Sequence, residues 1–174
     1  MKSRRNKIIV AMIALLLVAA IVPFNLLLAN RIPKQADAAL ENGTGFKLLS
    51  LTPTQFFAGM PTEGPEPPLF YGYPILGETE ITSPAIRKEL LSSLRKAVSR
   101  ASSFQPLPRC FNPRHGIRVT NNGTHFDFLI CFECLRMHIF SGAETNYVSL
   151  AGDQSAFDNA LSQAHVPLPP PPKH

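Results

Sequence analysis

The stretch GIRVTNNGTHFDFLICF, residues 116–132, decides the expected fold. Residues 116–120 have the pattern of a strand, and residues 121–124 are a turn signal, because Asn and Gly accept positive φ at low cost. The returning residues 125–132 end in an apolar run that occupies both faces, which indicates a strand covered on two sides. We therefore predict an antiparallel hairpin at the centre of a sheet.

The segments around this hairpin complete the predicted domain, residues 69–166. Residues 70–81 and 135–140 are further strand candidates. Ser83 and Pro84 begin a helix that runs to about Ser102, and a short helix follows Asp153 or Ser155 and ends before Pro167. The predicted fold class is α+β: a small antiparallel sheet with two packed helices, preceded by one N-terminal transmembrane helix.

The amino-terminal segment has the length of a membrane span. Ile8 to Ala29 carries no charge over 22 residues, and a helix of that length covers ~33 Å against a hydrocarbon core of ~30 Å. The basic residues before it should stay in the cytoplasm, which places the rest of the chain outside: Lys2, Arg4, Arg5 and Lys7. A cleaved signal peptide with secretion of the remainder is the main alternative, and a buried core helix is a third.

Proline-rich segments flank the predicted domain. Residues 30–68 have little regular pattern apart from one apolar island, so we predict a linker, and residues 167–174 predict a polyproline tail. We expect the island to pack on the domain, although a partner is the alternative; its members are Phe46, Leu48, Leu49, Leu51, Phe56 and Phe57.

The charge distribution argues against a nucleic-acid partner. The formal net charge is +5, but four of the 17 basic residues precede the apolar run, and the remainder nearly balance the 12 acidic ones. The basic side chains of the long helix predict a solvated face, with contact to anionic lipid headgroups as the alternative: Arg87, Lys88, Arg95, Lys96 and Arg100.

The chain has three cysteines, all in the predicted domain. One interpretation is a disulfide from Cys110 to Cys131 or Cys134, or else inert buried thiols; outside the cytoplasm, disulfides persist. A second is a zinc site in which Cys110, His115, Cys131 and Cys134 are the four ligands. We expect no cofactor, and zinc is the alternative.

Two further interpretations use sulfur chemistry directly. Cys131 and Cys134 could form a redox dithiol, although a strand lacks the helix N-terminus that lowers a thiol pKa in such proteins. Cys110 could be a nucleophile with His115 as its base, and Asp127 or Glu133 is available as a third group. No catalytic set is complete.

The motif CFNPRHGI at residues 110–117, followed by LICFEC at residues 129–134, resembles a family of bacterial membrane or secreted proteins whose activity is uncharacterised. The resemblance extends over about residues 70–168 and includes the motif YPILG at residues 73–77. It implies that the Cys110 loop and the Cys131–Cys134 strand act together in space, and it implies no particular metal, bond or reaction.

These observations predict an extracytoplasmic domain tethered to the bilayer, which acts as a non-enzymatic interaction or envelope-associated module with a protein partner. A zinc-binding or thiol-redox protein is the alternative. The prediction of a non-enzymatic module would be contradicted by turnover of an ester, peptide or disulfide that depends on Cys110.

The orientation of the chain is directly testable. We expect a reporter that is active only outside the cytoplasm, fused after His174, to be active, because the basic residues precede the apolar run. A fusion that is active only inside the cell would contradict both the anchor and the signal-peptide interpretations.

Overall fold

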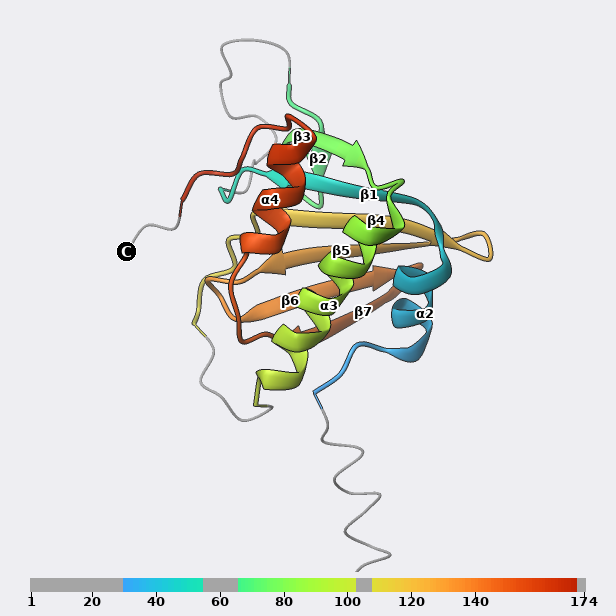
Figure 1. The fold of residues 1–174 in the computed structure, drawn as a ribbon. Coiled ribbons are helices and arrows are strands. Elements are labelled where there is room, and N and C mark those ends of the chain that lie inside the picture. Colours follow the sequence, from blue (N-terminus) through green and yellow to red (C-terminus); the bar gives the residue numbers. More distant parts are fainter. Residues whose placement is uncertain (1–29, 55–65, 103–107, 172–174) are drawn as a thin grey trace, which may run out of the picture.

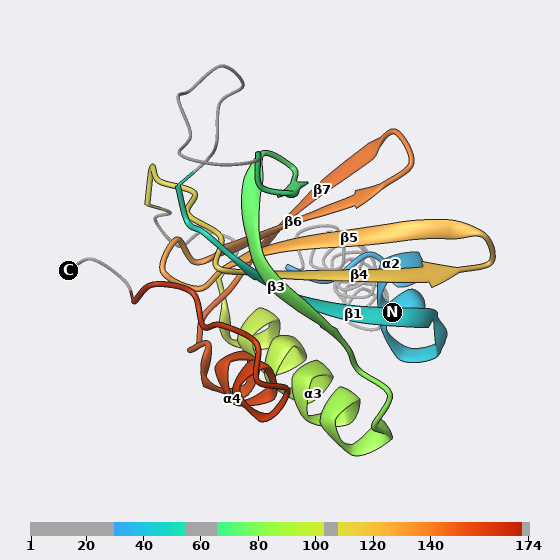
Figure 2. The ribbon, with the colours of Figure 1, turned by 90° about the horizontal axis from the view of Figure 1, so that it is seen from above.

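The computed structural model describes residues 30–54, 66–102 and 108–171. In this part of the chain, seven strands form one antiparallel sheet in the order β2-β3-β1-β4-β5-β6-β7, and three helices lie against it (Figure 1). Figure 2 shows that the sheet curls around α3 and α4 like half of a barrel. The elements are α2 (Lys34–Asn42), β1 (Thr44–Leu51), β2 (Leu69–Phe70), β3 (Tyr73–Glu80), α3 (Pro84–Arg100), β4 (His115–Asn121), β5 (Thr124–Cys131), β6 (Arg136–Ser141), β7 (Glu144–Ser149) and α4 (Ser155–Gln163).

The predicted small sheet with two helices is wrong. The sheet has seven strands and the described residues contain three helices, because part of the predicted linker, residues 30–68, belongs to the domain. Four members of its apolar island lie in β1, which runs between β3 and β4 in the middle of the sheet: Phe46, Leu48, Leu49 and Leu51. The other two, Phe56 and Phe57, lie outside the described residues. Pro33 precedes α2 and Pro53 follows β1, so these prolines bound the elements instead of excluding them.

The predicted central hairpin is confirmed. β4 pairs with β5 from His115↔Ile130 to Asn121↔Thr124, and the turn residues Asn122 and Gly123 both have positive φ. This register fixes which side chains face the helices, because successive residues of a strand point to opposite faces.

The helix face of the sheet holds the larger core. Ile117, Val119, Phe128 and Ile130 point toward the helices and pack with buried residues of α3 and α4. The predicted long helix is confirmed as α3, where the Ser83 hydroxyl accepts a hydrogen bond from the Ile86 N–H and Pro84 stands at the start.

The opposite face, here called the open face, is covered only in part. The short β2–β3 hairpin folds over it, so that Phe70 and Tyr73 pack with Leu49, Leu51 and Leu129. The turn of this hairpin is held down by a polar contact. Tyr71, with φ 52°, donates its hydroxyl to Asp127 at 3.1 Å. The same carboxylate accepts two hydrogen bonds from Arg118, at 2.8 and 2.7 Å.

The described residues begin at Asn30, directly after the apolar amino-terminal segment. Ile8 to Ala29 and the four basic residues before it lie outside the described residues. Within the described part of the chain, no helix is both long enough and apolar enough to span a bilayer.

The contact between the hairpin and the sheet depends on Gly116. A Cβ atom at this position would lie 2.9 Å from Cε1 of the Phe70 ring and 3.4 Å from Cβ of Leu49. We expect Gly116→Ala to lower the free energy of unfolding by about 1–3 kcal/mol because this face has no room for a methyl group. Urea denaturation measures the loss.

Phe70→Leu provides the matched control. The smaller side chain leaves room for the new methyl group, so the double variant should lose less stability than the sum of the two single losses. Strictly additive losses would contradict the proposed clash.

Candidate functional site

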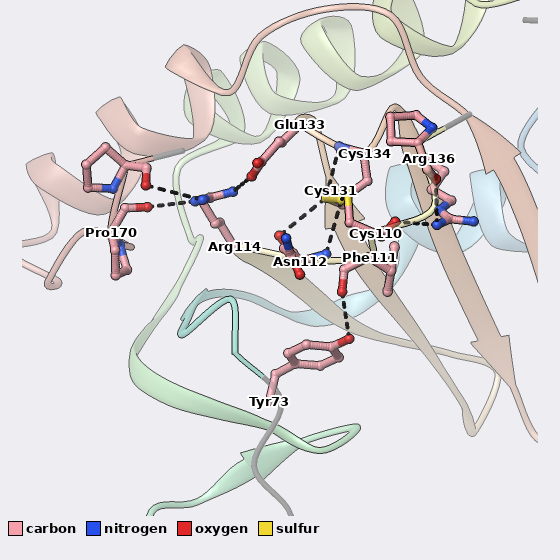
Figure 3. The surroundings of a disulfide bond; sticks show 12 residues. Tyr73, Cys110, Phe111, Asn112, Arg114, Cys131, Glu133, Cys134, Arg136 and Pro170 are labelled. Atoms are coloured by element: carbon pink, nitrogen blue, oxygen red, sulfur yellow. Dashed lines mark hydrogen bonds and ion pairs between the residues drawn. A yellow bond between two sulfur atoms is a disulfide. The ribbon is translucent and has the colours of Figure 1, made fainter. Parts of the chain in front are cut away.

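The three cysteines come together at one end of the open face. Cys131 is the last residue of β5, Cys134 lies in the turn to β6, and the two form a disulfide with their Cα atoms 5.2 Å apart. Cys110 lies in the loop before β4, and its Sγ is 3.5 Å from Sγ of Cys134 (Figure 3). The cluster therefore joins a thiol to a neighbouring disulfide.

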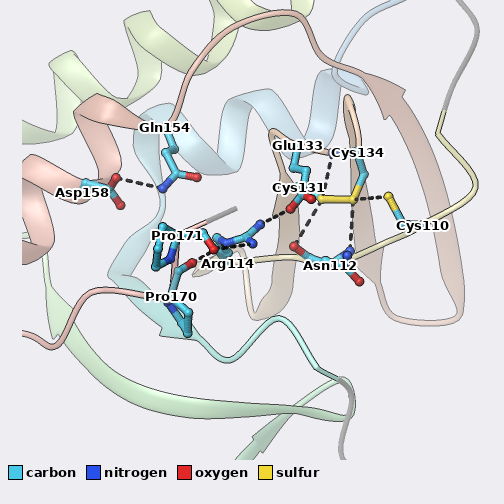
Figure 4. Close-up of polar contacts among 10 residues, drawn as sticks. All are labelled: Cys110, Asn112, Arg114, Cys131, Glu133, Cys134, Gln154, Asp158, Pro170 and Pro171. Carbon is cyan, nitrogen blue, oxygen red and sulfur yellow. Dashed lines mark hydrogen bonds and ion pairs between the residues drawn. A yellow bond between two sulfur atoms is a disulfide. The ribbon is translucent and has the colours of Figure 1, made fainter. Parts of the chain in front are cut away.

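The three cysteine residues differ in exposure. Cys131 is 1% exposed and Cys134 is fully buried, whereas Cys110 is exposed. In Figure 4 the sulfur atom of Cys134 lies between those of Cys131 and Cys110. A Cys110 thiolate that attacks Cys134 would therefore displace Cys131 as the leaving sulfur. The arrangement is thus suited to thiol–disulfide exchange within the chain.

Backbone groups surround the disulfide. The N–H of Asn112 donates to Sγ of Cys134 at 3.1 Å, and the N–H of Cys134 donates to Sγ of Cys131, also at 3.1 Å. The carbonyl oxygen of Asn112 lies 3.3 Å from Sγ of Cys131 and can accept a hydrogen bond when that sulfur is a thiol. Either sulfur therefore has a donor in place to stabilise negative charge after the bond breaks.

The loop that carries Cys110 is fixed to the open face. The Tyr73 hydroxyl donates to the Phe111 carbonyl at 3.0 Å, and the Phe111 ring stacks on His138 with centroids 3.7 Å apart. Arg136 donates to the carbonyls of Pro108 and Cys110. These contacts come from β3 and β6 and set the position of the thiol.

A second charged contact lies beside the cluster. Arg114 is nearly buried and pairs with Glu133, which stands between the two bonded cysteines. The same guanidinium donates to the carbonyls of Pro170 at 2.6 Å and Pro171 at 3.2 Å. The carboxyl-terminal segment, predicted as a polyproline tail, is thereby attached to the domain next to the disulfide.

His115 does not join the sulfur cluster. It faces the helices in register with Ile130, whereas Cys131, one residue further, faces the other way. The His115 side chain is fully buried, and its Nε2 lies 3.0 Å from Oδ1 of Asp158 in α4. Its Nδ1 is buried without a hydrogen-bond partner in the described residues.

Burial holds the pKa of His115 below its usual value, against the opposing effect of Asp158. The imidazole is therefore neutral at pH 7, with Nε2–H donating to the carboxylate. Burial raises the pKa of Asp158, but hydrogen bonds from His115 and Gln154 outweigh this effect, so its pKa lies below the usual value. The pair is a structural contact between β4 and α4.

The structure thus rearranges the predicted site. It brings together Cys110, Cys131 and Cys134, but pairs Cys131 with Cys134 instead of bonding Cys110 to either. The four-ligand zinc arrangement and the nucleophile–base pair both need His115, which is buried on the opposite face. Among the described residues, no group of three or more His, Cys, Asp and Glu side chains is placed to hold a metal ion.

Several residues of the site carry no signal in the sequence. Tyr73, Arg136 and Asn112 act through contacts made across the sheet, and Asp158 comes from a helix 43 residues away from its partner His115. Glu133 is the exception, because it lies between the two cysteines of the C-x-x-C motif. Comparison with protein-family models, curated proteins and solved structures finds no match to this chain.

The buried imidazole predicts a loss of stability in acid. Because the pKa of His115 is lowered on folding from 6.5, only the unfolded chain takes up this proton just below that pH. Its contribution to stability is complete above pH 6.5 and is lost progressively as the pH falls. His138, whose pKa burial lowers to about 4, acts in the same direction. Urea denaturation at a series of pH values measures the slope.

Three substitutions separate these contributions. His115→Phe and His138→Phe should each reduce the dependence of the unfolding free energy on pH between about 7 and 5. The exposed His125, replaced by Phe, is the matched control. An unchanged slope in His115→Phe would show that this ring does not control the acid response.

Proposed function

We propose that this chain is a thiol–disulfide exchange protein whose reactive cluster is Cys110, Cys131 and Cys134. The observation that carries the proposal is the 3.5 Å distance between Sγ of the exposed Cys110 and Sγ of the buried Cys134. A thiol at this distance from a disulfide can exchange with it without a large movement of the chain.

The first step is an isomerisation inside the protein. Cys110 gives its proton to solvent, and the thiolate attacks Sγ of Cys134. The Cys110–Cys134 bond forms and the Cys131–Cys134 bond breaks, with the electron pair passing to Sγ of Cys131. The Cys134 N–H, 3.1 Å from Sγ of Cys131, stabilises the resulting thiolate. No external oxidant or reductant is consumed.

This isomerisation would bring the disulfide to the surface. In the starting state an external thiol cannot reach Cys131 or Cys134, because both are buried. In the isomer, Cys110 is one half of the bond, and a thiolate from a partner dithiol protein can attack it and release Cys134. The second thiol of the partner then attacks the mixed disulfide. The partner is thereby oxidised to a disulfide, and the cluster is reduced to three thiols.

The proposed location agrees with this chemistry. We propose that residues 8–29 anchor the chain in the cell membrane with the domain outside the cytoplasm, where disulfides are maintained. The partners would then be exported or envelope proteins that carry thiols. A secreted form, released by signal cleavage, would use the same chemistry.

A second candidate is an interaction module without redox activity. It is favoured by exposed aromatic residues on the open face, where Tyr71 stacks on Phe140 and Tyr147 contacts His138. In this case the disulfide only fixes the β5–β6 turn. The two candidates differ in whether the disulfide ever leaves Cys131.

Alkylation without added thiol distinguishes them. If the bond exchanges, the full chain held at about pH 8.5, near the pKa of an ordinary thiol, then quenched in acid, unfolded and alkylated with a maleimide, should carry its single label on Cys110 in some molecules and on Cys131 in the others. Peptide mapping under non-reducing conditions measures both sites. Label confined to Cys110 in every molecule after this incubation would contradict the exchange.

Two variants control for direct opening of the bond. Cys110→Ser removes the attacking thiol and should abolish labelling of Cys131. Cys131→Ser leaves Cys110 and Cys134 as the only cysteines, and they should form a disulfide on mild oxidation. If Cys131 is labelled equally in Cys110→Ser, then Cys110 is not the attacking group.

A further inference from the structure

Asn30, the first described residue, is fixed to the domain. Its side-chain amide donates to the carbonyl of Val98 at 3.0 Å and to the carbonyl of Ser149 at 2.9 Å, and its Oδ1 accepts from the Ser149 N–H at 2.9 Å. These three hydrogen bonds join Asn30 to the last turns of α3 and the end of β7. The chain therefore meets the domain at a defined point that immediately follows the apolar segment 8–29.

This point lies at one edge of the molecule. Figure 1 shows the blue start of the described chain below β7 and beside the C-terminal end of α3. β7 is a terminal strand of the sheet, and β3 lies near the opposite edge. If residues 8–29 cross a bilayer, the predicted linker, residues 30–68, does not separate the span from the domain, because Asn30 is already bonded to it. The edge at Asn30 is then the part of the domain nearest the lipid surface.

Exposed cations and one aromatic residue lie near this point. Arg31 follows Asn30, Lys96 and Arg100 lie within two residues of Val98, and Tyr147, 71% exposed, lies two residues from Ser149. Asp153 faces Lys96 and Arg100 and is hydrogen-bonded to Ser155, and Glu89 lines the same hollow as these two cations. With Arg31, three cations outnumber these two acids at this edge.

Two other basic residues of α3, Arg87 and Arg95, have partners within the domain. Arg87 donates to the carbonyls of Leu40 and Gly43, and Arg95 forms ion pairs with Asp37 and Glu41. The basic helix face expected from the sequence is thus divided. Arg87 and Arg95 contact α2 and the residue that follows it. The last turns of α3 present Lys96 and Arg100 beside Asn30.

We propose that this edge, defined by Arg31, Lys96, Arg100 and Tyr147, lies against an anionic phospholipid surface. The proposal rests on the membrane anchor included in the proposed function, and it is independent of the sulfur chemistry. The cations face the lipid headgroups. Tyr147 lies at the membrane–water interface, where its ring contacts apolar lipid and its hydroxyl contacts headgroups or water. The domain then keeps one orientation on the membrane.

Tryptophan fluorescence tests this orientation, because the chain has no Trp of its own. The full chain carrying Tyr147→Trp is reconstituted into vesicles of brominated phosphatidylcholine with about 30% phosphatidylglycerol, an anionic lipid. We expect bromine to quench this Trp at least about twofold more strongly than a Trp at Leu76, an exposed position on β3 near the opposite edge. Equal quenching at the two positions would overturn the proposal.

Charge variants test the role of the cations. In the Tyr147→Trp background, Lys96→Glu should weaken quenching in the anionic vesicles. Lys88→Glu, about two helical turns nearer the N-terminus of α3, should leave the quenching unchanged. Its distance from Lys96 along the helix, ~12 Å, exceeds the screening length in physiological salt. Equal effects of the two substitutions would contradict the assigned edge.

Flotation of the same vesicles separates the possible failures. A chain that does not float with the lipid lacks the anchor, and the orientation proposal fails with it. A chain that floats but shows no selective quenching at position 147 has the anchor without the orientation. Neither result alters the alkylation pattern that tests thiol–disulfide exchange.

Discussion

The register between β4 and β5 is the constraint on which the rest of the structure depends. Pairing of His115 with Ile130 places both side chains under the helices and turns Cys131 to the open face. A shift of one residue would exchange the two faces and move Asp127 and Cys131 from the open face to the apolar core beneath the helices. The turn at Asn122 and Gly123 fixes this register locally, and the apolar residues of α3 and α4 fix it by burial.

The open face then becomes a platform for segments that arrive from elsewhere in the chain. The β2–β3 hairpin packs Phe70 against Gly116, and the loop before β4 places Phe111 on His138. Tyr73 connects the two segments through its hydrogen bond to the Phe111 carbonyl. The sulfur cluster therefore lies beside segments that are packed against the sheet. Residues of β3 and β6, as well as its own loop, set the position of Cys110.

In the proposed exchange, the difference in exposure between the cysteines sets which thiol attacks and which bond opens. Burial protects the Cys131–Cys134 bond from external thiols, while Cys110 connects it to solvent. The backbone N–H groups of Asn112 and Cys134 can hold negative charge on either sulfur, and Arg114 balances Glu133 in the same turn. The buried pair of His115 and Asp158 lies on the other side of the sheet and takes no part in the proposed exchange.

The sequence by itself determined the elements whose signals are local: the hairpin around Asn121 to Thr124, the capped helix from Pro84, and the proximity of Cys131 and Cys134 in a C-x-x-C turn. It did not reveal that part of the expected linker supplies α2 and the central strand β1, because proline punctuation does not show whether an apolar island between prolines finds strand partners. The sequence predicts Cys110 and His115 in one cluster, since they lie five residues apart. Only the tertiary structure decided that they face opposite sides of the sheet, because the side on which a strand residue lies depends on which residues its partner strand and the helices bury.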